Sequence, residues 1–229
     1  MPPWQIPASE KLTAFLKPYG TTSLKGSVTT PSELDIYSDV DIDISTPDNT
    51  PIDIKSLITK TAEHFGSKVF GYEAFIYERQ DVIRLCLENG YRFDITFNYP
   101  SAKEIRPACT PLEAVVNQFW FMAVMVLVKQ GRKDNLIAAH LALELCQLII
   151  VIQMLARDEA KGTNIYRFGD DEDVPILRAM AGVSVDTDSL LRLAVLYMDG
   201  EKADVLFTSA SPLPATPHTT PQPARPHES

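Results

Sequence analysis

Apolar and polar residues alternate in short segments throughout the first half of the chain. In VDIDI, residues 40–44, the period is two, which predicts a strand with one buried face and its acids on the other. Similar segments predict further strands at residues 69–77, 82–87 and 91–97. Asn89-Gly90 predicts a tight hairpin turn, because such a turn requires positive φ. Residues 52–65 have helical spacing, so we expect an amphipathic helix against the sheet.

The second half of the chain is predicted to be helical. The expected helices cover residues 112–129, 134–158, 174–180 and 189–206. The composition changes near residues 107–111, which divides the chain into a domain over residues 1–108 and a helical domain over residues 109–208. Residues 209–229 are rich in proline and offer almost nothing apolar to bury, so we expect a disordered tail. The predicted fold class is α+β: a small mixed β-sheet core with helices, followed by a C-terminal helical bundle.

Charge and cysteine content narrow the class of protein. The chain has 229 residues, and 21 basic against 30 acidic residues give a formal net charge of −9. This balance disfavours a nucleic-acid-coating surface and suits a metal or a cationic ligand. Three widely spaced cysteines, Cys86, Cys109 and Cys146, argue against a disulfide framework and a zinc site. We therefore expect a cytoplasmic protein without a signal peptide, in which the thiols act as small hydrophobic groups.

Two apolar segments have alternative interpretations. Residues 136–156 are long enough to span a bilayer, but His140 and Glu144 interrupt them, so we interpret the stretch as a core helix without membrane association. Glu144 must then pair, face a cleft or be neutral. The aromatic residues of FWFM, residues 119–122, could stack a ligand ring, yet their helical spacing favours the core.

The most informative segment joins a Gly-Ser pair to the acidic strand. Gly26-Ser27 offers backbone N–H groups that a phosphate can approach, because glycine lacks a side chain. After eleven intervening residues, Asp39 and Asp41 share one face, where their carboxylates repel unless a hard cation lies between them. Magnesium suits this site, because it takes oxygen ligands and completes its coordination with water and phosphates.

A third acid is expected beside this pair. In RFDITF, residues 92–97, apolar side chains alternate with Asp94, which would join Asp39 and Asp41 if the two strands were neighbours. Three carboxylates around two metal ions suit nucleotidyl transfer, in which one ion holds the triphosphate and the other lowers the pKa of the attacking hydroxyl. A merely solubilising acidic strand does not account for Gly26-Ser27 and Asp94 together.

These motifs resemble those of a known superfamily. LKGSVTTPSELDIYSDVDIDI, residues 24–44, looks like the signature of the DNA polymerase beta-like nucleotidyltransferases, and RFDITF looks like their third-acid strand. Residues 117–132 and GTNIYRFG, residues 162–169, are similar to the helical domain of aminoglycoside 6-adenylyltransferases. The resemblance implies an adenylyltransferase that uses ATP, or another nucleoside triphosphate, with Mg²⁺. It also implies a small hydroxyl-bearing acceptor, an aminoglycoside-like antibiotic that the added AMP inactivates, and hence antibiotic resistance.

The resemblance also implies roles for individual residues. The implied metal-binding and catalytic residues are Asp39, Asp41 and Asp94. The implied triphosphate-binding residues are Gly26, Ser27, Lys129 and Arg132, with Arg167 as a further candidate. The alternation leaves a second metal pair open, Asp41 with Asp43, although Ser38 directly before Asp39 favours the first pair.

The acceptor and the general base stay open at this stage. The chain is shorter than the usual aminoglycoside 6-adenylyltransferase, so the same chemistry on a lincosamide, a protein or a metabolite is an alternative. A non-catalytic nucleotide-sensing or antitoxin-like module is the competing class. The candidates for the base that takes the hydroxyl proton are Glu73, Glu104, Asp134 and Glu144.

Overall fold

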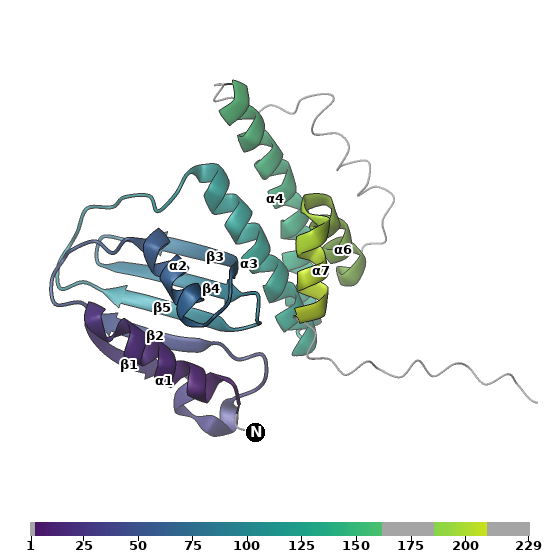
Figure 1. Cartoon of the computed structure of the whole chain (residues 1–229). Helices are drawn as coiled ribbons and strands as arrows, with labels where there is room; N and C mark the ends of the chain where they lie inside the picture. Colours follow the sequence, from purple (N-terminus) through teal and green to yellow (C-terminus); the bar gives the residue numbers. More distant parts are fainter. Residues whose placement is uncertain (1–2, 162–185, 210–229) are drawn as a thin grey trace, which may run out of the picture.

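The computed structural model describes residues 3–161 and 186–209, and within them the fold is mixed α/β (Figure 1). Five strands form one mixed sheet in the order β1-β2-β5-β4-β3. Strands β2 and β5 are parallel, and the other neighbours are antiparallel. This confirms the α+β class at its coarse level. The predicted helix at 174–180, Arg167 and the tail from residue 210 lie outside the described residues.

Most described elements match predicted ones with small shifts of their ends, and the exceptions are an additional N-terminal helix and a break within residues 189–206. The strands are β1 Thr21–Lys25, β2 Val40–Ser45, β3 Val69–Ile76, β4 Gln80–Leu87 and β5 Arg92–Asn98. The helices are α1 Gln5–Leu16, α2 Ile54–His64, α3 Pro111–Gly131, α4 Asn135–Lys161, α6 Thr187–Met198 and α7 Gly200–Ser209. Four of the described helices follow residues whose side chains accept a hydrogen bond from the first turn: Asp53, Thr110, Asp186 and Asp199.

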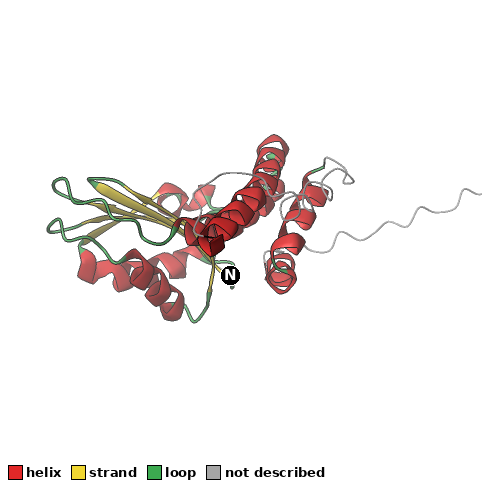
Figure 2. Ribbon diagram, turned by 90° about the horizontal axis from the view of Figure 1, so that it is seen from above, coloured by secondary structure: helices red, strands yellow, loops and turns green. Residues whose placement is uncertain are grey.

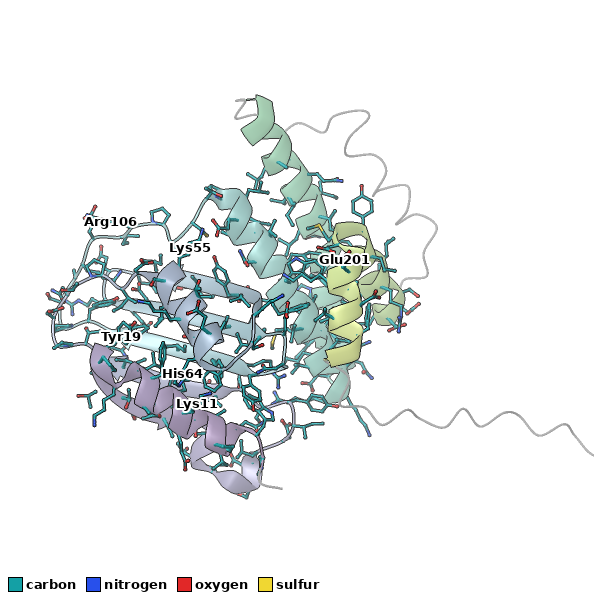
Figure 3. All side chains as sticks on the ribbon, in the orientation of Figure 1. Lys11, Tyr19, Lys55, His64, Arg106 and Glu201 are labelled. Carbon is teal, nitrogen blue, oxygen red and sulfur yellow. The ribbon has the colours of Figure 1, made fainter. Side chains whose placement is uncertain are left out.

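Helices α1 and α2 cover one face of the sheet (Figure 2). Alternate residues of the central strands, such as Ile42 and Ile95, are buried against them. Figure 3 shows Lys11 of α1 and His64 of α2 on this same side of the sheet. The sequence patterns did not predict α1, because Pro7 and a weakly amphipathic sequence mask a spacing that buries Leu12 and Leu16.

Helix α3 covers part of the opposite face, where it crosses β3 and contacts β4. A Cβ at Gly71 of β3 would lie 2.4 Å from the backbone nitrogen of Phe121, so glycine permits this close approach. Phe119 and Trp120 are buried in a core that α3 shares with α4, α6 and α7, which confirms the core interpretation of these aromatics. Phe70 and Cys86 of the sheet belong to the same core, while the domain division at residue 108 stays a prediction.

The predicted helix at 189–206 is wrong in one respect, because two helices occupy it. Asp199 has an extended backbone and ends α6, and its carboxylate accepts a hydrogen bond from the backbone N–H of Lys202 at the start of α7. Gly200 follows, and glycine is a poor residue for a helix interior. The periodic apolar positions of the two helices conceal this break.

Two helices in the described ranges are long and apolar enough to cross a membrane by length and composition. They are Pro111–Gly131 and the Asn135–Ala156 part of α4. Core helices of soluble proteins pass the same test, and both helices contribute side chains to the shared core. All three cysteines are free, with Cys86 and Cys146 buried, as expected for small hydrophobic groups.

Candidate functional site

Charged side chains form a row across the sheet on the face that α3 only partly covers. The backbone register pairs Lys25 with Asp41, Asp41 with Asp94, Asp94 with Arg84, and Arg84 with Glu73. Residues in register on neighbouring strands project from the same face. We call these five residues the charged row. It places Asp41 and Asp94 side by side at its centre, as expected from strands that are neighbours.

Burial and nearby like charges raise the pKa values of the acids in the charged row. Burial and the neighbouring carboxylates of Asp39 and Asp94 raise the pKa of Asp41 to about 6. Burial also raises the pKa of Asp94, although Arg84 opposes this shift. Arg84 Nε lies 3.2 Å from Asp94 Oδ2, and Arg84 Nη1 lies 3.8 Å from Glu73 Oε2. In the described part of the chain, Asp41 forms no ion pair, so its charge is the least compensated of the row.

Gly26 lies directly against Asp41. Its φ of +62° falls in the left-handed region, and a Cβ would lie 2.1 Å from Asp41 Oδ2. A side chain at this position would therefore displace the carboxylate. Ser27 follows in a short 3₁₀ turn, Gly26–Thr29, that leads out of β1. The Gly-Ser pair thus reaches the acidic strand from the neighbouring strand.

Asp39 and Asp43 have different surroundings. Asp39 precedes β2 and is partly exposed. Asp43 forms an ion pair with Lys25 and accepts a hydrogen bond from Asn98 Nδ2 at 3.5 Å. A cation therefore already compensates Asp43, whereas Asp41 lies between Gly26 and Asp94.

The two predicted basic residues are placed differently. Arg132, at the end of α3, forms two hydrogen bonds with the carboxylate of Asp35, at 3.0 and 3.1 Å. It also lies 3.4 Å from Ser38 Oγ, next to Asp39. Asp35 raises the pKa of Arg132, so the guanidinium stays charged. Lys129 instead pairs with Asp134 at 3.7 Å. The structure brings Arg132 to the start of the acidic strand and directs Lys129 to a neighbouring carboxylate.

The candidate general bases also differ in their surroundings. Glu73 belongs to the charged row, is largely buried, and burial raises its pKa. Glu104 is exposed and pairs with Arg106 at 2.6 Å. Glu144 is partly exposed and lies 3.3 Å from His140 Nε2. Of the three alternatives for Glu144, the structure shows the paired one, with His140 as its partner on a partly exposed face of α4.

The donor set fits a hard divalent cation. Within residues 3–161 and 186–209, no group of three or more His, Cys, Asp or Glu side chains is already arranged to hold a metal ion. Asp41 and Asp94 supply two carboxylates side by side, and Mg²⁺ in proteins commonly takes only one or two, with phosphates and water completing the shell. Burial and, to a smaller extent, neighbouring carboxylates raise their pKa values, and a bound cation would favour the ionised form of both acids.

Sequence reasoning missed Arg84 and Arg92. Arg84 joins Asp94 to Glu73, and Arg92 donates hydrogen bonds to the backbone carbonyls of Ile36 and Ser38, at 3.3 Å each. Both arginines alternate with apolar residues on predicted strands, so the alternation places them on the polar face of the sheet and gives no other sign of a role.

The chain matches no family model and no curated protein.

Proposed function

We propose that this protein is a Mg²⁺-dependent nucleotidyltransferase that transfers AMP, or another nucleoside monophosphate, from a nucleoside triphosphate to a hydroxyl of a small acceptor. One observation carries the proposal. Asp41 and Asp94 lie in register on parallel neighbouring strands, Asp41 forms no ion pair with any described residue, and Gly26 packs against the same carboxylate. The proposal includes the finer architecture, a nucleotidyltransferase core with a C-terminal helical bundle, and a cytoplasmic location.

The acids and Gly26 have separate roles in the proposed reaction. Asp41 and Asp94, with Asp39 beside them, would hold Mg²⁺, which when bound neutralises triphosphate charge and makes the attacking hydroxyl more acidic. Gly26 leaves open backbone at the edge of this pair, where the triphosphate can approach. The ion pair of Asp43 with Lys25 supports the assignment of the metal pair to Asp39 and Asp41.

The transfer also requires a group that accepts the hydroxyl proton. Among the four candidates, Glu73 is the one in the charged row, and its raised pKa suits a base that works near neutrality. In the balanced step, the acceptor oxygen bonds to the α-phosphorus. The bond from phosphorus to the bridging oxygen breaks, pyrophosphate leaves with the electron pair, and Glu73 takes the proton.

The experiment that tests this proposal follows pyrophosphate release. The purified chain would be incubated with Mg²⁺, ATP and a pooled panel of hydroxyl-bearing small molecules, and the products would be weighed by mass spectrometry. We expect an added-AMP mass that disappears without Mg²⁺ and in Asp41→Asn. A matched control, Asp43→Asn, should retain activity, because Asp43 is already paired with Lys25. Release that is indifferent to Asp41 would refute the proposal.

A further inference from the structure

A chamber of about 340 Å³ lies beside the charged row. Its walls come from the start of α1, the loop before β2, the start of β3, the hairpin between β4 and β5, helix α3 and helix α7. Most of the wall is apolar, with Leu127 of α3 and Val205 of α7 facing Tyr37 and the hairpin. This volume lies within the range of small-molecule sites, about 300–1,000 Å³. The chamber is therefore large enough for a ring system.

The chamber and the charged row share the same surface of the sheet. Arg92, which lines the chamber, lies two residues before Asp94, and Cys86 lies two residues after Arg84. Arg92 and Cys86 are themselves paired in register. They therefore form the next rung of the sheet, about 7 Å from the row, because residues two apart on a strand share a face. A molecule in the chamber would lie within one side-chain length of Asp94.

The walls favour a flat aromatic ligand. Trp4 and Tyr91 stack with ring centroids 4.8 Å apart and an angle of 8° between their planes, and both line the chamber. Ile36 at the same site is 53% exposed, which leaves apolar surface uncovered by the described residues. Such walls bind rings by stacking and by burial of apolar surface.

Arg92 sets the charge preference of the chamber. Its guanidinium lies 5.8 Å from the Trp4 ring and donates to the carbonyls of Gly90, Ile36 and Ser38. In the described ranges, it forms no ion pair with a carboxylate. Three of its five N–H groups are used, so donors remain for an acceptor atom of a ligand. Glu88 also lines the chamber, but it interacts electrostatically with Lys202. The partly buried cation of Arg92 therefore disfavours a polycationic ligand and suits a neutral or anionic one.

The position of the chamber indicates which substrate it serves. Gly26-Ser27 follows β1, on one side of β2, whereas Arg92 begins β5 on the other side. In an in-line transfer, the attacking oxygen approaches opposite the departing pyrophosphate. If the phosphates occupy the Gly26 side of Asp41, the acceptor must approach from the β5 side, where the chamber lies.

We propose that this chamber binds a flat aromatic ring of the acceptor, neutral or anionic, and so presents the acceptor hydroxyl to Asp41 and Asp94. This inference rests on the nucleotidyl transfer proposed above. It replaces the aminoglycoside-like acceptor with one that bears an aryl ring. The net charge of −9 is a property of the whole surface, whereas Arg92 lies at the site itself and therefore bears more directly on the charge of the ligand.

The first arm of the test measures binding without catalysis. Anilinonaphthalene sulfonate, a fluorescent aromatic anion, would be titrated into the full chain. We expect saturable binding with one site, weakened at least about tenfold by Leu127→Trp or Val205→Trp, which fill the chamber from two different helices. Ile137→Trp adds the same ring on the exposed side of α4 and should leave binding unchanged. Asp41→Asn should also bind normally, because Asp41 does not line the chamber.

The second arm measures transfer with an aryl alcohol panel and a polyamine sugar panel. We expect transfer to aryl alcohols, with a higher acceptor KM in Leu127→Trp and an unchanged KM for ATP. Absence of saturable dye binding, or binding indifferent to both chamber variants, would overturn the inference. Transfer to the amino sugars with a KM indifferent to Leu127→Trp would overturn the acceptor class and leave the nucleotidyl transfer intact. Dye binding without transfer to any acceptor would instead refute the enzyme and its acceptor role.

Discussion

Two groups of acids on opposite faces of the same sheet have opposite electrostatic surroundings. On the partly open face, Asp41 and Asp94 lie side by side with raised pKa values. On the face covered by α2, Asp81 is almost fully buried, yet Lys103 Nζ lies 3.0 Å from its carboxylate, and the Tyr99 hydroxyl donates a hydrogen bond to it at 2.6 Å. In the first group only Asp94 has a cationic partner, Arg84, and Asp41 forms no ion pair within the described residues, whereas Asp81 is fully compensated.

This difference separates a site that binds from a site that stabilises. Burying Asp81 without a partner would be costly, so Lys103 and Tyr99 stabilise the folded state by satisfying its carboxylate. They also fix the loop after β5, because Lys103 belongs to that loop. Asp41 and Asp94 repel each other in the folded state, which costs stability unless a ligand relieves the repulsion. Substitutions at one group should therefore change activity, and substitutions at the other should change stability.

The largest effect is expected from Asp41→Asn. Loss of one ligand for the metal should lower kcat/KM by at least about a thousandfold, which corresponds to roughly 4 kcal/mol of transition-state stabilisation. The folded protein should not be weakened. The pKa of Asp41 is raised to about 6 in the folded protein, which means that the folded state binds this proton more tightly than the unfolded state does. The protonated carboxyl therefore stabilises the folded state at low pH, and this contribution to the free energy of unfolding is lost as the pH rises through about 6.

Chemical denaturation across pH 5 to 8 checks this second part. The wild-type free energy of unfolding should fall, relative to that of Asp41→Asn, as the pH rises through about 6. Asp94→Asn should behave in the same direction, because the pKa of Asp94 is also raised. A variant that loses activity because it unfolds would contradict the separation of binding from stability.

Lys103→Met should break the compensated site. It leaves the carboxylate of Asp81 buried without a cation, which costs about 3–5 kcal/mol of unfolding free energy. Catalytic turnover per folded molecule should stay unchanged, because Asp81 lies on the opposite face of the sheet. The double variant Asp81→Asn with Lys103→Met removes both charges and should recover most of the loss. Failure of the double variant to recover would show that Lys103 stabilises by packing alone.

The sequence predicted each site to a different degree. The alternation in residues 40–44 predicted the strand and the shared face of its acids, because the period of a strand is set by local geometry. The position of Asp94 beside Asp41 depends on the parallel pairing of β2 with β5, which the strand patterns alone do not predict. Arg84 could not be predicted at the site, because its place depends on the register of two further strands.

The elements that were missed share a physical cause. Helix α1 buries Leu12 and Leu16 in the core, but Pro7 lowers its local helical signal, and tertiary packing decides its structure. The chamber could not be predicted, because its walls come from six segments that lie far apart in the sequence. The pairing of Lys103 with Asp81 joins a loop residue to a strand residue, which no local periodicity predicts.

Two glycine variants, with smaller expected effects on stability, test whether Gly26 belongs to the site. Gly26 and Gly66 both have a φ of +62°, so alanine at either position should cost about 1 kcal/mol of stability from backbone strain. A Cβ at Gly66 meets nothing within 4 Å, whereas a Cβ at Gly26 meets Asp41. Gly26→Ala should therefore lose activity and additional stability, and Gly66→Ala should lose only the strain energy. Equal effects of the two variants on activity would contradict a role for Gly26 at the site.

Arg84→Met is expected to have the smallest effect, and it tests the electrostatics of the charged row. Arg84 lowers the pKa of Asp41, Asp94 and Glu73, so its removal should raise all three. A carboxylate must be ionised to bind Mg²⁺, and the acid limb of Mg²⁺ affinity should move to higher pH, as calorimetric titration at several pH values would show. Lys25→Met is the control, because Lys25 pairs with Asp43, and its removal should move the limb less. Equal shifts in the two variants would mean that the general charge of the face, rather than the contact of Arg84 with Asp94, controls the ionisation of the pair.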